Sequence, residues 1–92
     1  MATLHMDIEA CRSVQSSMKS QHDQMVQALS TVTGSVNQTV GSSWIGNSAS
    51  EFQQQYESLR SAITSQLDQL EQLSSAFANE ITQWETVSSK LG

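Results

Sequence analysis

Proline is absent from the 92-residue sequence, and cysteine, histidine and charged residues are scarce. The single Cys11 excludes a disulfide within one chain, and with only two histidines a structural zinc site is not expected. Four basic against nine acidic residues give a formal net charge of -5, which argues against nucleic acid and an anionic membrane surface as partners. No apolar run approaches the roughly 18 residues that cross a bilayer, so stable membrane insertion is not expected.

The chain is long enough for one domain, residues 1–92, but too short to bury a large core. A protein of this length buries only about 60 to 65% of the surface of its unfolded chain. Without a disulfide or a metal, association with a second chain is the remaining source of stability. The segment Met1–Arg12 has no basic region followed by an apolar core, so we expect no Sec signal peptide and a protein that is cytoplasmic before any export.

Apolar residues before Trp44 recur at spacings of three and four, which predicts a helix over about residues 7–40. Asp7 is its expected N-cap. Gly34 and several β-branched residues weaken the segment Ser30–Gly41, but we favour a helix there because the apolar spacing continues and no second strand could pair with it. The apolar stripe consists of Leu4, Ile8, Cys11, Val14, Met18, Met25, Leu29, Val32, Val36 and Val40.

A second and stronger apolar series predicts a helix over about residues 48–90. Ser48 and Glu51 have the spacing of a capping box at its start. Glu57 and Arg60 are expected to pair on its exposed side. The series consists of Ala49, Phe52, Tyr56, Leu59, Ile63, Leu67, Leu70, Phe77, Ile81, Trp84 and Leu91, flanked by Ala62, Leu73, Ala76 and Val87.

A turn over about residues 41–47 joins the two predicted helices, so the expected fold is all-α, an antiparallel helix-turn-helix hairpin. The apolar face of each helix is wider than one neighbouring helix can cover. We therefore expect the hairpin to dimerise into a four-helix bundle. The residues expected to pack within the hairpin and the dimer are Met18, Met25, Leu29, Ala49, Phe52, Tyr56, Leu59, Ile63, Leu67 and Leu70.

The turn itself contains Trp44, Ile45 and Gly46, and thus places a large indole among small and polar residues. Gly46 is expected to adopt backbone angles that other residues avoid. Centred between two long amphipathic helices, this tripeptide resembles the WXG motif of the small WXG (ESAT-like) proteins, which are substrates of type VII secretion. The agreement extends to Ala49, Phe52 and Tyr56.

The resemblance spans essentially the whole chain and implies a hairpin that dimerises head-to-tail, with itself or with a paralogous WXG protein. It also implies export as a folded dimer by a machine with an FtsK/SpoIIIE-type ATPase, from a Gram-positive or related bacterium. The exported protein would be a virulence-associated effector, adaptor or export partner. Since both predicted helices have near-continuous apolar faces, we favour a homodimer.

One departure from the family concerns the export signal. Many members carry Tyr-x-x-x-Asp/Glu after the second helix, but here the only tyrosine is Tyr56 and the residue four positions later is Arg60. Either a partner protein supplies the signal, or an apolar and acidic pattern near the C-terminus replaces it. The candidate for that pattern is Ile81, Trp84 and Glu85, although Trp84 also fits the apolar stripe as a core residue.

Three further residues need individual interpretation, and two of them have alternative roles. Trp44 either turns inward and plugs the end of the bundle or belongs to a surface that the secretion machine recognises. His22 replaces an apolar residue of the stripe, as a hydrogen-bonded interface residue or as a pH switch that loosens the bundle when protonated. Cys11 is expected to be a small buried hydrophobe. It lies about 16 Å from His22 along a helix, so the two cannot form a catalytic pair.

No catalytic arrangement is apparent, so neither an enzyme nor a cofactor is expected. Three functions remain open: a secreted type VII substrate, a cytosolic structural tether or assembly factor that is not secreted, and a stand-alone relative of the targeting domains of larger toxins. The cytosolic reading leaves Trp44 and Gly46 without a purpose, and the first reading is therefore favoured.

Overall fold

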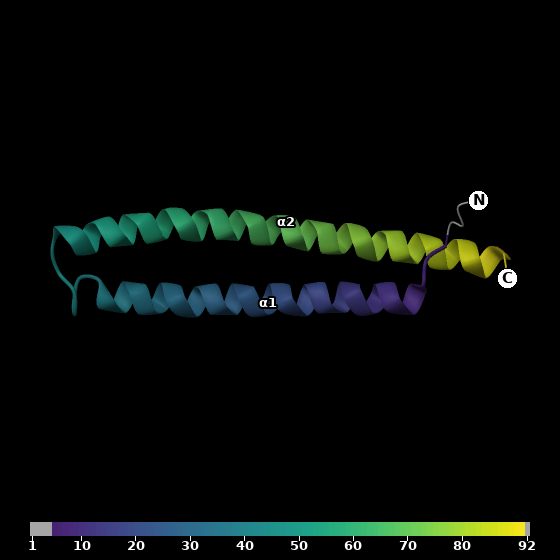
Figure 1. The fold of residues 1–92 in the computed structure, drawn as a ribbon, viewed down its shortest axis with the longest axis horizontal. Helices are drawn as coiled ribbons and strands as arrows, with labels where there is room; N and C mark the ends of the chain where they lie inside the picture. The colour runs from purple at the N-terminus through teal and green to yellow at the C-terminus, as the bar shows by residue number, and fades with distance from the viewer. Residues whose placement is uncertain (1–4, 92) are drawn as a thin grey trace.

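Two antiparallel helices joined by a turn make up the part of the chain that the structure, a computed structural model, describes, which is residues 5–91 (Figure 1). Helix α1 spans Ile8–Thr39 and helix α2 spans Asn47–Leu91. They form a rod of 68 × 21 × 18 Å. The predicted all-α hairpin is confirmed. Because α2 has 45 residues and α1 has 32, the last turns of α2 extend past the start of α1.

Side-chain hydrogen bonds accompany both the start of helix α1 at Ile8 and its continuation to Thr39. The backbone N–H of Ala10 donates to Asp7 Oδ1 at 3.0 Å, which confirms Asp7 as the N-cap. The segment rich in β-branched residues stays helical up to Thr39, as predicted. Side-chain hydroxyls in this segment donate to the carbonyl oxygens four residues earlier, a local bond that helical Ser and Thr commonly form. These hydroxyls belong to Thr31, Thr33 and Ser35.

The start of α2 differs from the prediction. The helix begins at Asn47, and the N–H of Ser50 donates to the carbonyl oxygen of Gly46 at 3.1 Å. Ser48 therefore already lies within the first turn and cannot act as the N-cap. The predicted capping box of Ser48 and Glu51 is wrong because Gly46, with its unusual backbone angles, takes the position before the helix.

The contact between the helices is narrow and partly polar. Among the described residues, only Ala49, Leu67 and Ile81 are buried apolar side chains, and the buried Ser74 lies on the same line. Gln15 Nε2 donates to Ser74 Oγ at 3.2 Å. The remaining half-buried positions of this seam include Ile8, Cys11, Met18, Leu29, Thr33, Val36, Tyr56, Ile63, Leu70 and Phe77.

The predicted apolar stripe of α1 is therefore divided: some of its side chains face α2, and others face solvent. Its members Val14, Met25 and Val32 are 53%, 42% and 50% exposed. Polar residues occupy the seam in their stead, namely Gln15, His22 and Thr33. The seam follows seven-residue steps from Ile8 to Val36 and does not include the whole apolar stripe. Residues at this spacing stay on the inner side because the two helices supercoil slightly around each other.

The solvent-accessible surface of the chain is large for its mass. It measures 6974 Å² for 10.1 kDa. A compact monomer of this mass is expected to expose about 5,300 Å². The hairpin thus exposes about a third more surface than a compact fold would.

Candidate functional site

The backbone of the turn is held by a small set of hydrogen bonds. The N–H of Trp44 donates to the carbonyl oxygen of Thr39 at 2.9 Å, and the N–H of Gly41 donates to that of Trp44, also at 2.9 Å. Gly41 and Gly46 have φ angles of 93° and 133°, which L side chains rarely adopt. A Cβ at either position would meet no atom within 4 Å, so a side chain would have room there. Glycine is required because of the backbone angle alone. The expectation for Gly46 is confirmed.

Aromatic and aliphatic side chains give this end of the rod an apolar surface. The ring of Trp44 lies 5.4 Å from that of Phe52, centroid to centroid, at an interplanar angle of 44°. This is a tilted arrangement of the kind that aromatic pairs favour. Trp44 remains 38% exposed and Ile45 76% exposed. The indole therefore rests against α2 near the turn and is only partly covered, so a complete plug is not formed within one hairpin.

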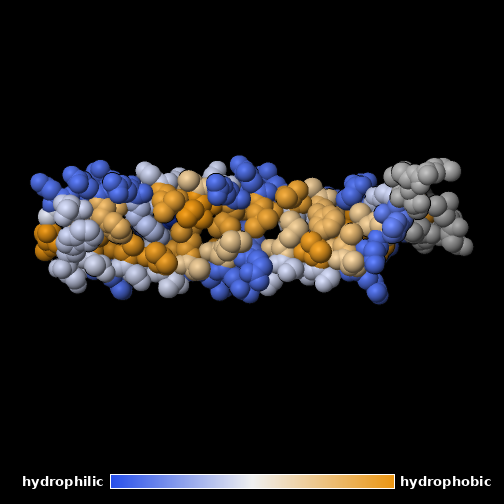
Figure 2. Space-filling model, viewed as in Figure 1, coloured by the Kyte–Doolittle hydropathy of each residue, from blue (hydrophilic) through white to orange (hydrophobic). Residues whose placement is uncertain are grey.

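One face of the hairpin carries a band of exposed apolar side chains from both helices. Helical geometry, at 100° per residue, turns these residues to the same side of the seam on α1 and on α2. Figure 2 shows the hydrophobic surface along the middle of one face, with hydrophilic surface at both edges. We call this the apolar face and define it by Val14, Met25, Val32, Phe52, Leu59, Leu73 and Val87, all at least 41% exposed.

Charged pairs gather on the other side of the seam. Arg12 Nη2 lies 2.8 Å from Glu85 Oε1 and so joins the two helices. The helical positions of Arg12, Glu85 and Glu71 turn them away from the apolar face. The predicted pair of Glu57 and Arg60 is confirmed at 2.7 Å, and this hydrogen bond raises the pKa of the Arg60 guanidinium.

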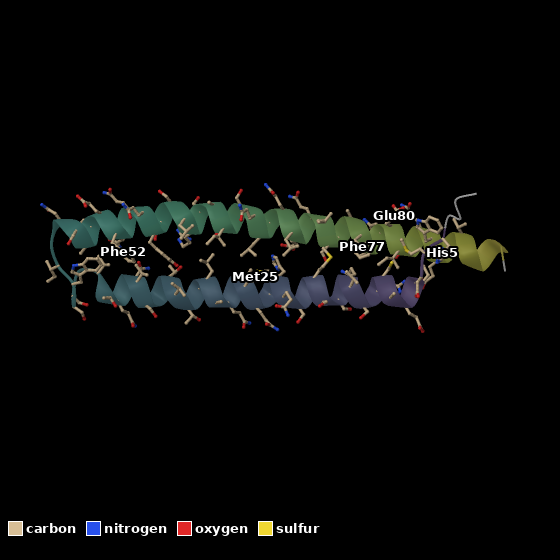
Figure 3. The ribbon with its side chains drawn as sticks, in the orientation of Figure 1. His5, Met25, Phe52, Phe77 and Glu80 are labelled. Atoms are coloured by element: carbon tan, nitrogen blue, oxygen red, sulfur yellow. The ribbon has the colours of Figure 1, made fainter. Side chains whose placement is uncertain are left out.

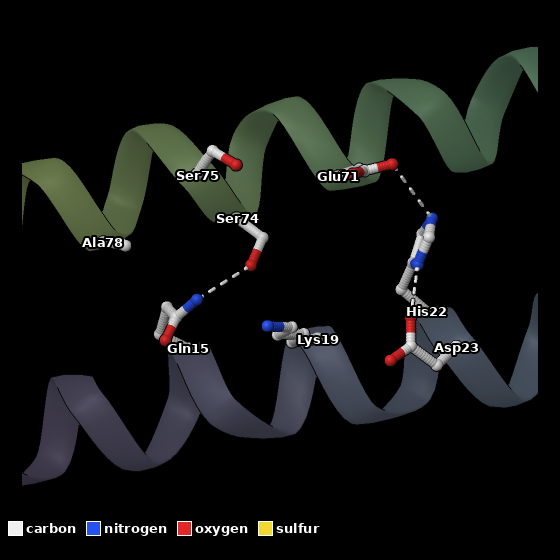
Figure 4. A pocket seen from close by; sticks show the side chains of 8 residues that line it. All are labelled: Gln15, Lys19, His22, Asp23, Glu71, Ser74, Ser75 and Ala78. Atoms are coloured by element: carbon white, nitrogen blue, oxygen red, sulfur yellow. Dashed lines mark hydrogen bonds and ion pairs between the residues drawn. The ribbon is translucent and has the colours of Figure 1, made fainter.

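His22 lies in a polar hollow of about 200 Å³ on this charged side (Figure 4). Its side chain is 13% exposed, with Nδ1 at 3.1 Å from Asp23 Oδ1 and Nε2 at 3.8 Å from Glu71 Oε2. Lys19 also lines the hollow. Protonated His22 would be attracted by both carboxylates, so these contacts oppose the predicted loosening on protonation; the switch itself stays a prediction.

The predicted export pattern near the end of α2 contains three different environments. Ile81 is 1% exposed, so its side chain cannot touch a partner while the hairpin is closed. Glu85 is engaged with Arg12. Trp84 is half-buried, and its Nε1 donates to Glu80 Oε1 at 3.2 Å. Together with Gln83 and Val87, these two residues line a largely apolar hollow of about 190 Å³.

The residues predicted to pack fall into two groups. Met18, Leu29, Ala49, Tyr56, Ile63, Leu67 and Leu70 are buried or half-buried along the seam. Met25, Phe52 and Leu59 are 42%, 41% and 56% exposed on the apolar face. Figure 3 labels Met25 on α1 and Phe52 on α2. The structure thus leaves the second group free for contacts outside the hairpin.

Sequence reasoning missed two features of this arrangement. The first is the polar seam formed by Gln15, Ser74 and Thr33, which the seven-residue spacing from Ile8 could have revealed. The second is Gly41, whose positive φ makes it a second glycine that the turn requires. A glycine directly after the end of an apolar helical series is a common helix stop signal.

The part of the chain that the structure describes contains neither a metal-binding cluster nor a membrane-spanning helix. Within residues 5–91, no three His, Cys, Asp or Glu side chains lie close enough together to hold a metal ion. Over the same range, neither helix contains an apolar stretch of the length that crosses a membrane.

Comparison with known proteins identifies the family. A family model described as "Proteins of 100 residues with WXG" (WXG100) matches residues 3–86, which include the turn and most of both helices. No curated protein and no solved structure matched the chain. Members of the matched family are small helical proteins of the type VII secretion substrate kind and typically pair with other WXG proteins. The central Trp-Ile-Gly turn, the two long helices and this match together show that the chain belongs to the WXG100 family.

Proposed function

We propose that this protein is a non-enzymatic type VII secretion substrate, which leaves the cell by a Sec-independent route as a folded helical dimer. The observation that carries the proposal is the turn with Trp44 and Gly46 between two long antiparallel helices, in a chain that the family model covers almost completely. In this role the protein acts by binding, as a secreted effector or adaptor or as the export partner of another WXG protein.

The apolar face supports the dimeric form. Its seven large side chains are at least 41% exposed in the hairpin alone. Monomeric proteins rarely expose large contiguous apolar patches. Covering it with a second hairpin produces a four-helix bundle and removes the excess exposed surface described above.

Two aromatic sites, one exposed at Trp44 and one half-buried at Trp84, are candidates for recognition by the FtsK/SpoIIIE-type ATPase. Trp44 and Ile45 form the tip at the turn, and Trp84 lines the hollow near the end of α2. Tryptophan is enriched among residues that dominate binding energy. Ile81 no longer belongs to this proposal because it is buried, whereas Trp84 and Glu85 remain within it.

A secretion assay tests the proposed function. The protein is followed in the culture supernatant and in the cells of its native host, with and without the type VII ATPase. We expect it in the supernatant only when the ATPase is present, and a cytosolic marker protein controls for lysis. Retention in the cytosol in both strains would contradict export and favour the cytosolic tether instead.

A further inference from the structure

We infer that the hollow beside Trp84 binds one lysine or arginine side chain of a partner polypeptide. This inference names the chemistry of the residue that the second recognition site accepts, and it rests on the proposed function only for the identity of the partner. The position of the hollow, its charge and its size support it.

The hollow lies where α2 extends past the start of α1 (Figure 1). Two hydrogen bonds between the helices join residues whose numbers add up to 89. By the same total, Ile8, the first residue of α1, lies level with Ile81. The residues that line the hollow all belong to α2 and are Glu80, Gln83, Trp84 and Val87. Three of these four follow Ile81, so α1 does not reach over the hollow.

An apolar surface and a carboxylate lie side by side in this hollow. Its four residues follow one another at helical spacings of three and four and therefore share one face of α2. Val87 is 52% exposed and Trp84 is half-buried. Trp84 Nε1 donates to Glu80 Oε1 at 3.2 Å, which holds the indole beside the carboxylate. Glu80 itself is exposed on the surface of α2.

The carboxylate of Glu80 is available for a cation. It accepts one bond from Trp84, but an ionised carboxylate has lone pairs for further donors. Among the side chains that the structure describes, no basic group pairs with Glu80, whereas Glu85 is held by Arg12 at 2.8 Å. Residues 61–89 include four acidic residues and no basic one. This part of α2 therefore attracts positively charged partners and repels negatively charged ones.

A lysine or arginine side chain matches both properties of the hollow. Each has an apolar stem that lies well against Val87 and the indole, and a charged head that pairs with Glu80. Tryptophan is also the aromatic side chain that attracts cations most strongly. An apolar side chain would instead take water away from the Glu80 carboxylate without replacing its hydrogen bonds.

The size of the hollow fits one side chain and not a cofactor. It measures about 190 Å³, which is below the roughly 300 to 1,000 Å³ of typical small-molecule sites. A single side chain at an exposed site binds weakly, with a dissociation constant on the order of 1 mM. The basic residue therefore adds selectivity to a contact whose affinity comes from several places.

A second copy of this chain is the alternative occupant. Two of its four basic residues are already engaged, since Arg12 pairs with Glu85 and Arg60 with Glu57. A second copy would thus offer few free cations to Glu80. A partner with its own basic segment complements the net charge of -5 better.

Binding of short synthetic peptides to the full-length protein tests the inference. The NMR signal of the Trp84 indole N–H, assigned by its loss in Trp84→Phe, reports on the hollow. The probe is a capped peptide Gly-Leu-Lys-Leu-Gly, compared with peptides that carry norleucine or glutamate in place of lysine. We expect the lysine peptide to bind about tenfold more tightly than the norleucine peptide, and the glutamate peptide to leave the signal unchanged. Raising the salt concentration should weaken only the lysine peptide.

A charge-removing variant provides the second measurement. Glu80→Gln keeps an acceptor for Trp84 Nε1 but should bind the lysine peptide about tenfold less tightly. Glu51→Gln, at an exposed residue near the other end of α2, is the matched control and should bind like the wild type. Equal affinities for the lysine and norleucine peptides, or for Glu80→Gln and the wild type, would overturn the inference.

Two further outcomes separate this inference from its neighbours. A Trp84 signal that moves with protein concentration but not with any peptide shows that a second copy fills the hollow, and this also overturns the inference. A chain that prefers the lysine peptide but stays in the host cell contradicts only the proposed export. A secreted chain without that preference contradicts only the basic partner.

Discussion

The two faces of the hairpin are built from the same two helices but differ in chemistry. The apolar face presents leucine, valine, methionine and phenylalanine side chains with exposures of 41% to 60%, whereas the opposite side presents the pair of Arg12 and Glu85 and the hollow around His22. Exposed ion pairs gain little from being covered, while exposed apolar side chains gain much. The difference teaches that the charged side of the hairpin is stable in water as it stands, whereas the apolar face gains free energy if another surface covers it.

Introducing a charge into the apolar face should have the largest effect. In Leu59→Glu, two carboxylates per dimer would be moved from water into an apolar contact, at about 2 kcal/mol or more each. We expect the dissociation constant of the dimer to rise about a thousandfold, as measured by sedimentation. Ser65→Glu, on the outer side of α2, is the control and should remain dimeric; dissociation of both variants would contradict the distinction between the faces.

Removing a side chain from the seam should have the next largest effect. Ile81 is 1% exposed, and Ile81→Ala should reduce the free energy of unfolding by about 2 to 5 kcal/mol. Chemical denaturation at constant protein concentration measures it. The matched change Ile45→Ala, at a residue 76% exposed, should cost less within the hairpin. Equal losses would show that the seam does not carry the stability of the hairpin.

The tip requires a finer comparison because Trp44 touches Phe52 and is also exposed. Trp44→Ala should lower the free energy of unfolding by about 2 kcal/mol, less than for a buried tryptophan, because the indole is 38% exposed. Thermal melting and secretion are to be measured together. Unchanged melting with lost secretion identifies a recognition residue; a large loss of stability with normal secretion identifies a packing residue.

The smallest effect is expected on the charged side. His22→Gln removes the imidazole that faces Asp23 and Glu71, with Lys19 lining the same hollow. Because both carboxylates are largely exposed, we expect a change of less than about 1 kcal/mol at pH 8. If His22 is the predicted switch, the wild type should lose stability between pH 7 and 5 relative to the variant. The neighbouring carboxylates predict no such relative loss, and melting curves at both pH values decide between the two.

Much of the fold was predictable because local signals act over short distances. The spacing of apolar residues predicted the hairpin, Asp7 predicted the helix start, and Trp44 with Gly46 predicted the turn and the family. Ser48 was misassigned because a glycine at the preceding turn can begin the helix without a side-chain cap. The local sequence does not decide whether Gly46 or Ser48 is the residue that precedes the helix.

The direction of each apolar residue was less predictable. Val14, Met25 and Val32 share the helical spacing of the seam, yet they lie on its exposed side, while Gln15 and Thr33 face inward. A wide apolar stripe on an isolated helix can serve two neighbours, and only the packed pair shows which residues face which neighbour. For the same reason the sequence did not show that Ile81, a candidate recognition residue, is buried in the seam.

The sparse interior of the hairpin has a consequence for the protein at low concentration. With only Ala49, Leu67 and Ile81 as buried apolar side chains in the described region, a separated chain retains little to hold its helices together. In the proposed dimer, folding and association are then one equilibrium, and the folded fraction falls as the protein is diluted. Under the proposed export, the chain would be ordered near its source, where it is concentrated, and open to proteolysis where it is diluted.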